Sequence, residues 1–456
     1  MYIERQTSDH PPQPIARRLQ HCTKTLHRTR SHAPTSRKIY TKSIDARSNP
    51  RIFLSAGEAS GDHYGAQIIT ALRTSLPGTD FFGLGGREME AAGLQRIVRA
   101  EDVAHMGITE VVRHMPYIYG QYRHLVASIK ERRPDIAVLI DFPDVNFRLA
   151  RELKKLGIPV LYFVSPQLWA WKRSRLRWVQ QRVDRMMVIF PFEEDFYRAR
   201  GVNAAFVGHP LAELPKPAIT RENYAAQNNL DPAKQWIALL PGSRRKEVDA
   251  NLPVLLETAS RLNADHKYEF LLAVASTLDN DWMHSQTTRN NAPPSPNLHL
   301  VPDAREALHH ARAGIVASGT ATVQAAVIGN PFVVVYRVSP LTFHMAKRLI
   351  EYPAEVPAQT DADGNLPIAM VNLIAGRRIV PELLQSRFTA ENILAALDPL
   401  LSDTPQRSQM IADLADVGRI LRPTDESSSI RRVCDAVEEL LAQNRQPRGP
   451  NSARSV

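Results

Sequence analysis

The stretch RIFLSAGEASGD, residues Arg51–Asp62, decides the fold class of this 456-residue chain. Its apolar run has the length of a strand and leads through small residues into a helical pattern over Tyr64–Ser75. A second apolar run, Asp80–Leu84, follows directly. A strand, a crossover helix and a second strand in this order form a parallel pair. The sequence therefore predicts an α/β fold built on a doubly wound parallel sheet.

The same alternation runs through two stretches of the chain, on either side of the proline-rich segment Pro210–Pro217, which we interpret as a linker. Further strands are predicted at Ile136–Ile140, Pro159–Val164, Arg185–Phe190, Trp236–Leu240, Glu269–Val274, Leu298–Val301, Gly314–Ala317 and Phe332–Val338, and further helices at Val145–Leu156, Val248–Leu262 and Thr320–Ile328. Two such halves predict two facing Rossmann-like domains with a cleft between them.

We place these domains at residues 49–210 and 211–388, followed by helices at 389–442 that pack across them. Asn280–Pro296 and Tyr352–Pro367 are predicted to be loops, because they are rich in turn-forming and polar residues. Residues 443–456 are polar and are predicted to form a disordered tail.

The net charge of +10 is concentrated at the start of the chain. Residues 1–50 hold ten Lys and Arg against three acids, a net charge of +7, so the remaining residues carry only +3. A nucleic-acid footprint over the whole protein is therefore not indicated. Residues 1–48 lack the apolar core of a secretory signal and superficially match an organellar transit peptide, but we interpret them as a basic, disordered extension or a wrongly assigned start.

Two cysteines, Cys22 and Cys434, are too few for a disulfide framework or a cysteine metal site, which fits a reducing compartment. No apolar run approaches the roughly 18 residues of a membrane span. Any contact with a membrane is therefore expected to be peripheral.

Acidic residues follow two of the predicted strands. Glu58 and Asp62 lie among small residues after the first strand, where either a binding site or a tight structural turn fits the pattern. Asp141 directly follows Ile140, at the strand end where open α/β sheets place catalytic groups. A general base and a loop-ordering carboxylate are equally compatible with this position. Asp144 is better explained as the N-cap of the next helix.

The second half repeats the strand, small-residue and helix junction twice. In LLPGSRRKE, residues 239–247, Arg244 lies where a helix N-terminus and a planar guanidinium can bind a diphosphate. In ASGTATVQ, residues 317–324, Gln324 lies one helical turn in, within reach of ribose hydroxyls. An ordinary helix capped by Thr320 is the alternative there.

Two further patterns are weaker. Asp361-Ala362-Asp363 has the DxD spacing of metal-dependent glycosyltransferases, but it lies in a polar loop rather than after a strand, so we assign no metal to it. The Met- and Tyr-rich stretch from Met106 to Tyr119 is explained by core packing, or by an exposed apolar patch for lipid chains.

Six segments occur in an order that resembles the lipid-A-disaccharide synthase family. They are AGEASGD (Ala56–Asp62), VSPQLWAW (Val164–Trp171), FVGHP (Phe206–Pro210), LLPGSR (Leu239–Arg244), SGTA (Ser318–Ala321) and NLIAGR (Asn372–Arg377). Each is weak alone, but together they are specific, above all VSPQLWAW with LLPGSR.

The resemblance implies a GT-B fold and a metal-independent, inverting transfer without a cofactor. The donor would be UDP-2,3-diacylglucosamine and the acceptor 2,3-diacylglucosamine 1-phosphate, giving a β-1,6-linked disaccharide 1-phosphate and UDP. It further implies peripheral contact with an anionic membrane, at the inner face of the cytoplasmic membrane. The oligomeric state is left open, a homodimer included, and no nucleic acid is expected as a partner.

By position, Asp141 and Arg244 match the family's essential aspartate and arginine and are the predicted catalytic residues. The predicted substrate-binding residues are Gly57, Glu58, Ser60, Gly61, Asp62, Ser243, Ser318, Gly319, Thr320, Gln324, Arg337, Asn372 and Arg377. The predicted membrane and acyl contacts are Met106, Ile108, Val111, Val112, Met115 and Ile118. The chain departs from the family at Gln324, usually Glu, in a longer loop at Pro353–Pro367, and in residues 1–48.

Two other readings stay open. Another GT-B protein, such as a peptidoglycan glucosaminyltransferase or a UDP-sugar epimerase, would share the fold and nucleotide site, although VSPQLWAW argues against it. A protein that binds nucleic acid or an anionic membrane through the basic tail is the second. Deleting residues 1–48 separates these readings, because catalysis should survive the deletion and tail-driven binding should not.

Overall fold

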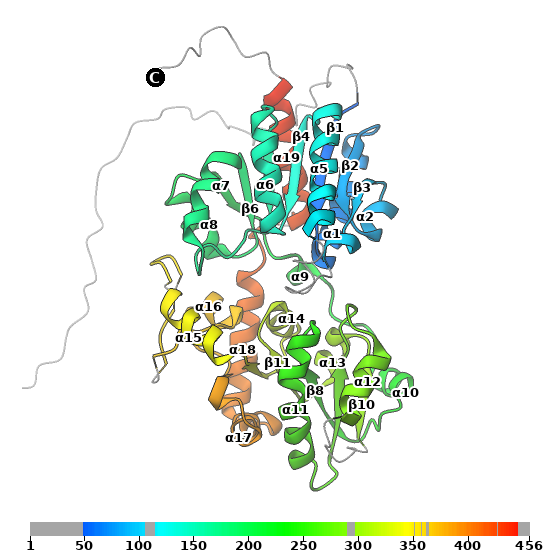
Figure 1. Ribbon diagram of the computed structural model, residues 1–456. Coiled ribbons are helices and arrows are strands. Elements are labelled where there is room, and N and C mark those ends of the chain that lie inside the picture. Colours follow the sequence, from blue (N-terminus) through cyan, green and yellow to red (C-terminus); the bar gives the residue numbers. More distant parts are fainter. Residues whose placement is uncertain are drawn as a thin grey trace, which may run out of the picture. The chain divides into compact units, whose positions relative to one another are not determined.

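The computed structural model describes residues 49–104, 115–289, 297–350, 352–356, 358–361, 364–425 and 427–445. Within this part of the chain, two parallel β-sheets are each covered by helices (Figure 1). The predicted α/β class and the two Rossmann-like halves are therefore confirmed.

The first sheet has seven strands in the order β3-β2-β1-β4-β5-β6-β7. Their bounds are β1 (Arg51–Ala56), β2 (Asp80–Gly85), β3 (Gln95–Arg99), β4 (Ile136–Ile140), β5 (Val160–Phe163), β6 (Arg185–Val188) and β7 (Ala204–Phe206). The order reverses between β1 and β4, which pair in parallel with Ala56 opposite Ile140. This reversal is a topological switch point, where ligands of open α/β sheets bind beyond the carboxyl ends of the strands.

The second sheet has six strands in the order β10-β9-β8-β11-β12-β13. Their bounds are β8 (Gln235–Leu240), β9 (Tyr268–Ala273), β10 (Leu298–Val301), β11 (Ala313–Ala317), β12 (Phe332–Tyr336) and β13 (Glu382–Leu384). The strand order reverses between β8 and β11, which pair in parallel. Strand β8 ends at Leu240, within the LLPGSR segment, and β11 ends at Ala317, directly before SGTA. In this sheet too, ligands are therefore expected beyond the carboxyl ends of the strands at the reversal.

Helices connect the strands. In chain order the longer ones are α1 (Ala59–Ser75), α2 (Arg87–Ala91), α5 (Met115–Arg132), α6 (Pro143–Lys155), α7 (Leu176–Arg182), α8 (Pro191–Arg198), α10 (Arg221–Asn228), α11 (Arg245–Leu262), α12 (Asn280–Arg289), α13 (Ala304–His310), α14 (Thr320–Ile328), α15 (Pro340–Leu349), α16 (Met370–Ala375), α17 (Ala390–Leu401), α18 (Pro405–Ile420) and α19 (Ser429–Arg445). Short helical turns are α3 (Glu101–Ala104), η1 (Arg173–Arg175), α9 (Pro210–Glu213) and η2 (Gln385–Arg387). No helix among these described segments is long and apolar enough to cross a membrane.

Burial explains why the strands read as unbroken apolar runs. All five residues of β4 are buried, because helices cover both faces of the sheet around it. The same holds for β11. A strand that is buried on both faces needs no polar alternation, so β4 and β11 contain no polar side chain.

The three C-terminal helices divide between the two sheets (Figure 1). Helix α17 packs on α11, and α18 packs on α14 and α16, all beside the second sheet. Helix α19 instead returns to the first sheet and packs on α1, β4 and β5. Ser75 Oγ donates to Glu438 Oε1 at 2.7 Å, which fastens α19 to the end of α1.

The differences from the sequence-based expectation include three strands and one helix. Strands β3, β7 and β13 were not predicted, because β3 mixes Arg with apolar residues and the other two have only three residues each. The expected loop at Asn280–Pro296 begins instead with helix α12, while residues 290–296 lie outside the described part. Asp279 Oδ1 accepts the Trp282 N–H at 2.9 Å and thereby starts this polar helix.

Candidate active site

Two turns meet at the switch point of the first sheet, one after β1 and one after β4. Gly57 lies in the first turn and is buried against the ring of Phe142 in the second. A Cβ at Gly57 would lie 2.4 Å from Phe142 Cδ1, far inside van der Waals contact. Only glycine therefore lets the two turns approach this closely.

The turn after β4 holds its backbone in a rarely populated conformation. Asp141 and Phe142 have φ values of +44° and +50°, in the left-handed region that non-glycine residues usually avoid. Such strain persists only where surrounding contacts over-determine it. It therefore draws attention to what fixes Asp141.

Buried Asn146, on the first turns of α6, supplies one part of that fixation. Its Nδ2 donates to the carbonyls of Asp141 at 2.7 Å and Ile140 at 3.1 Å, and its Oδ1 accepts the Ser55 hydroxyl at 2.6 Å. Asn146 thereby ties the end of β4 to the end of β1. Asn146 was not among the predicted site residues, because its burial and its contacts appear only in the folded chain.

Strand β5 supplies the other part. Tyr162 donates its hydroxyl to the Asp141 carbonyl at 2.6 Å, and the Asp141 N–H donates to the Phe163 carbonyl at 2.9 Å. The Asp141 peptide is thus held from both sides. The backbone from which its carboxylate projects is therefore fixed at the sheet edge.

The Asp141 carboxyl group has a raised pKa. Burial first, and the negative charge of Glu58 second, raise the pKa of Asp141 from 3.8 to about 6, although the Phe142 N–H and Arg244 oppose the rise. A carboxylate with a pKa near 6 is ionised at neutral pH and is still a better proton acceptor than an ordinary aspartate. These properties suit a general base.

Arg244 approaches this carboxylate from the second sheet. It is the N-cap residue of α11, and its Nη2 lies 4.0 Å from Glu58 Oε1. Its side chain is 71% exposed, so the guanidinium is open to a ligand. Asp141, Glu58 and Arg244 therefore form one electrostatic group.

The helix N-terminus at Arg244 is already occupied by a carboxylate of the protein. Glu247 Oε2 accepts the N–H groups of Ser243 at 3.0 Å and Arg244 at 3.3 Å. Gly242 makes this turn with φ +127°, and a Cβ there would lie 2.7 Å from Glu247 Cβ. The backbone donors that the sequence assigns to phosphate are therefore free for it only when Glu247 turns away.

The junction after β11 is more open. Gly319, with φ +147°, is the N-cap of α14, and Thr320 is exposed as the first helical residue. The alternative of a helix capped by the Thr320 side chain is wrong, because no side chain caps α14. Ser318 and Gln324 are half-buried at this edge, so both can face a ligand in part.

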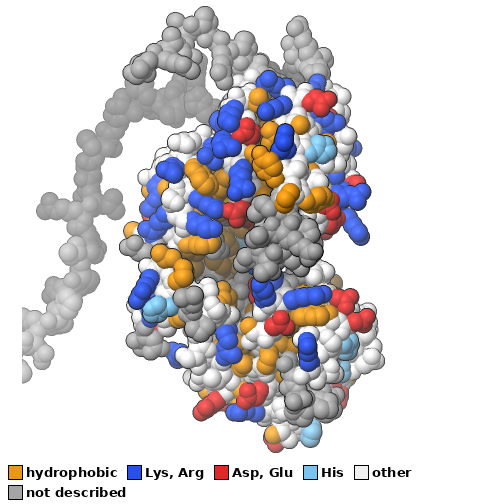
Figure 2. All heavy atoms as spheres, in the orientation of Figure 1, with side chains coloured by type: hydrophobic (Ala, Val, Ile, Leu, Met, Phe, Trp, Pro, Cys, Tyr) orange, Lys and Arg blue, Asp and Glu red, His pale blue; other side chains and the backbone are white. Residues whose placement is uncertain are grey.

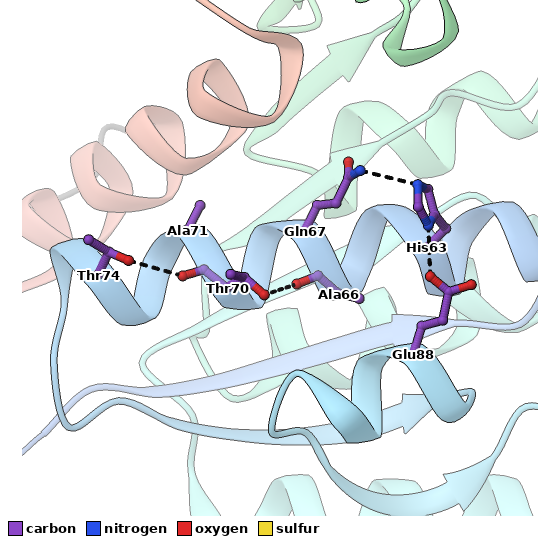
Figure 3. A pocket seen from close by; sticks show the side chains of 7 residues that line it. All are labelled: His63, Ala66, Gln67, Thr70, Ala71, Thr74 and Glu88. Atoms are coloured by element: carbon purple, nitrogen blue, oxygen red, sulfur yellow. Dashed lines mark hydrogen bonds and ion pairs between the residues drawn. The ribbon is translucent and has the colours of Figure 1, made fainter. Parts of the chain in front are cut away.

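A shallow cavity of about 360 Å³ lies along the outer side of α1 (Figure 3). His63 Nδ1 lies 2.7 Å from Glu88 Oε2, and its other ring nitrogen faces Gln67 (Figure 3). The remaining lining residues, Ala66, Thr70, Ala71 and Thr74, are small. Nothing in this lining connects it with the group around Asp141.

Comparison with known proteins places the chain in a family. The family model described as Lipid-A-disaccharide synthetase matches residues 52–429. A protein of Acidobacterium capsulatum named lipid-A-disaccharide synthase is 54% identical over 412 residues, which cover 86% of this chain and 97% of that protein. One of Koribacter versatilis with the same name is 49% identical over 384 residues, covering 84% and 96%. This chain belongs to the lipid-A-disaccharide synthase family.

Solved structures support the fold. The calicheamicin glycosyltransferase CalG4 has a TM-score of 0.54 at 16% identity, and covers 87% of this chain and 99% of its own. A UDP-GlcNAc 2-epimerase of Neisseria meningitidis has a TM-score of 0.53 at 10% identity, covering 86% and 100%. The predicted GT-B fold and the membership among glycosyltransferases are confirmed.

Several family-motif residues that are predicted to bind substrate make hydrogen bonds within the protein. Asp62, at 8% exposure, accepts the N–H groups of Gly86 at 2.7 Å, Glu88 at 3.0 Å and Met89 at 3.1 Å, and so holds the start of α2. Three backbone donors satisfy this carboxylate. The neighbouring Ser60 is exposed and Gly61 is buried against Ala56.

The NLIAGR motif is likewise engaged within the protein. Asn372 is fully buried and donates to Val380 O and Glu382 Oε1, while its Oδ1 accepts the Ile379 and Val380 N–H groups. Arg377 forms a paired contact with Asp413 of α18, the shorter at 2.6 Å. These residues shape the second domain.

Two more assignments look different in the structure. The Arg337 guanidinium donates to the carbonyls of Phe388 and Gln385 and stacks over the Phe388 ring. The prediction that Asp144 is the N-cap of α6 is wrong, because Phe142 takes that position. The Asp144 carboxylate pairs with Arg175 at 2.7 Å.

The remaining assignments fall largely beyond what the structure describes. Met106, Ile108, Val111 and Val112 lie outside the described residues, as do residues 1–48 and the side chain of Met115. Ile118, on α5, is half-buried. Asp361 accepts the Asn365 N–H at 2.8 Å, and Asp363 is outside the described part. The described residues contain no group of three or more His, Cys, Asp or Glu that could hold a metal ion.

Proposed function

We propose that this protein transfers 2,3-diacylglucosamine from UDP to 2,3-diacylglucosamine 1-phosphate, forming the β-1,6-linked lipid A disaccharide 1-phosphate and UDP. The observation that carries the proposal is Asp141, a largely buried carboxylate with a pKa raised to about 6, next to the charges of Glu58 and of Arg244, which lies 4.0 Å from Glu58. It stands in a chain that is 54% identical to a protein named for this reaction.

Asp141 acts as the general base. The 6-hydroxyl of the acceptor attacks the anomeric carbon of the donor, the bond from that carbon to the UDP oxygen breaks, and the hydroxyl proton passes to the Asp141 carboxylate. Attack opposite to the leaving group inverts the anomeric centre. General bases of this kind contribute about 10²–10⁴-fold to the rate.

Arg244 stabilises the departing UDP. As the glycosidic bond breaks, negative charge develops on the diphosphate, and an exposed guanidinium at a helix N-terminus can pair with it. The N-termini of α11 and α14 add two positive dipole ends. Donor binding would displace Glu247 from the Ser243 and Arg244 N–H groups, because two anions cannot share those donors.

The substrates carry acyl chains, so we place the enzyme at an anionic membrane surface, on the inner face of the cytoplasmic membrane. Residues 143–182, which contain α6, η1 and α7, hold nine Lys and Arg against two acids. Lys and Arg side chains gather over this part of the molecule (Figure 2). Each cation near an anionic bilayer contributes about 1 kcal/mol.

Exposed aromatic side chains accompany these cations. Tyr117 and Tyr119 on α5 and Trp171 before η1 are 45%, 60% and 52% exposed. Aromatic rings of this kind settle at the headgroup level of a bilayer. They complement the proposed apolar contacts of the Met106–Ile118 stretch.

The proposal is tested by incubating purified protein with both diacyl substrates and following the products by mass spectrometry. We expect a disaccharide 1-phosphate as product, with one UDP released for each disaccharide formed. Release of UDP without a disaccharide would mean that water, rather than the second sugar, is the acceptor, and would refute the proposal. Deleting residues 1–48 should leave the yield unchanged.

A further inference from the structure

A buried carboxylate lies close to the strand that fixes Asp141. Glu193, on the first turn of α8, is 1% exposed. Its Oε1 accepts the Ser165 hydroxyl at 2.8 Å and the Trp169 indole N–H at 3.2 Å, and its Oε2 accepts the Phe190 N–H at 3.3 Å. No ion pair joins Glu193 to a cation among the described residues. A buried carboxylate without a paired cation is unfavourable, so its presence calls for a specific role.

The donors around Glu193, among them the Ile189 N–H as well, require an acceptor on both carboxylate oxygens. An ionised carboxylate satisfies all of them. A carboxamide of the same shape cannot, because its NH₂ group would face the Phe190 N–H or the donors of Ser165 and Trp169. The hydrogen bonds therefore favour the ionised form, whereas burial opposes it and raises the pKa of Glu193 to about 7.

Ser165 and Trp169 belong to the loop that follows β5, residues 164–171, which contains the VSPQLWAW motif. The loop begins at Val164, a β-branched residue in the left-handed region with φ +61°. Such a residue is a genuine outlier and must be held by its surroundings. Glu193 accepts hydrogen bonds from Ser165 and Trp169, one and five residues after Val164. The Tyr197 hydroxyl donates to the Pro166 carbonyl of the same loop at 3.2 Å.

The same loop is continuous with the strand residues that hold Asp141. Phe163, directly before Val164, accepts the Asp141 N–H, and Tyr162 donates to the Asp141 carbonyl. A shift of the loop would therefore be passed through two residues of β5 to the peptide of the base.

We propose that Glu193 is a positioning residue for the transfer reaction, which holds the strained loop 164–171 through Ser165 and Trp169 and thereby orients Asp141. Glu193 touches no substrate in this account. The proposal rests on the function proposed above.

The test compares Glu193→Gln with the neighbouring Glu194→Gln in the full-length protein. Glu194 is the matched control, because its carboxylate is 24% exposed and pairs with Arg198 on the outer side of the same helix. For Glu193→Gln we expect kcat to fall by about 10–100-fold, since misplacing a reacting group by about 1 Å has effects of this size. The Kd for UDP should stay within about twofold of wild type, because the nucleotide site lies on the second sheet. Glu194→Gln should match wild type in both measurements.

A second readout separates positioning from plain stability. The acidic limb of the kcat profile reports Asp141 with the groups that face it, Glu58, Arg244 and the hydroxyls of Tyr64 and Tyr162. A displaced Asp141 should move this limb, whereas a loss of stability alone should lower the amount of folded enzyme and leave the limb in place.

A folded Glu193→Gln variant with wild-type kcat and an unmoved limb would overturn the proposal. If this variant does not fold, Ser165→Ala decides the matter, because it removes a single donor from the network. A lowered kcat at unchanged UDP affinity then supports the positioning role, and a wild-type kcat overturns it. Wild-type protein that forms no disaccharide would instead refute the proposed function itself.

Discussion

Replacing Glu58 by Gln tests the electrostatic account of Asp141. The pKa of Asp141 rises from 3.8 to about 6, with burial as the largest cause and Glu58 as the second. Removing the Glu58 charge leaves the burial in place, so the pKa should fall by only part of the rise, about 0.5–1 unit. The change also removes the contact of Arg244 with Glu58, while its contact with Glu247 at 3.4 Å remains.

The pH dependence of kcat/KM measures this shift. A general base works only when ionised, so activity rises with pH through the pKa of Asp141. A lower pKa moves the acidic limb of the profile to lower pH. At pH 5.5 the variant should then retain about two- to threefold more of its own plateau activity than wild type does. Glu257→Gln, an exposed carboxylate on α11, is the control and should leave the limb unchanged. A limb that stays in place or moves to higher pH would refute the coupling between Glu58 and Asp141.

Three further predictions follow from the described contacts. Asp62→Ala should lower the free energy of unfolding in urea by about 2–4 kcal/mol, because three backbone N–H groups lose their acceptor; a change below about 0.5 kcal/mol would show that α2 does not depend on it. The pKa of Glu193 in the folded state lies above its unfolded value of 4.5, so wild type loses stability as the pH rises from 4.5 through about 7. Glu193→Gln has no such loss, so the free energy of unfolding of the variant minus that of wild type should increase by up to about 3 kcal/mol between pH 4.5 and 8. A difference that does not change with pH would contradict this. Arg244→Ala should weaken UDP binding measured by calorimetry, whereas Arg245→Ala should change it little, because the Arg245 guanidinium lies over Trp282. EDTA should leave the rate of transfer unchanged. Inhibition by EDTA that Mg²⁺ reverses would contradict a metal-independent transfer.

The sequence predicted those elements whose patterns are local. The bounds of β4 and α14 agree with the expected Ile136–Ile140 and Thr320–Ile328. An unbroken apolar run marks β4, and small residues mark the start of α14. The three-residue strands β7 and β13 could not be found in this way, since three residues are too few to show a periodicity. Their pairing is decided by neighbouring strands rather than by their own composition.

The site shows the same division. Asp141 and Arg244 were singled out by their positions after strands, which the α/β fold makes meaningful, and the family resemblance then predicted their catalytic roles. The partners of Asp62 lie 24 to 27 residues away in the chain, so its commitment to α2 depends on tertiary contacts that no motif displays. The same is true of Asn146, whose importance follows from the hydrogen bonds it makes to two different strands.

The role of Asp141 is tested most directly by Asp141→Asn, which keeps the shape of the side chain and removes its basicity. In a single-turnover reaction with saturating donor and acceptor, the rate of disaccharide formation should fall by about 10²–10⁴-fold. UDP affinity, measured on the same preparation, should stay near wild type, because the nucleotide is assigned to Arg244 and the second sheet. A variant that retains a near-normal rate would contradict the account, and the base would then have to be sought elsewhere, with Glu58 as the next candidate.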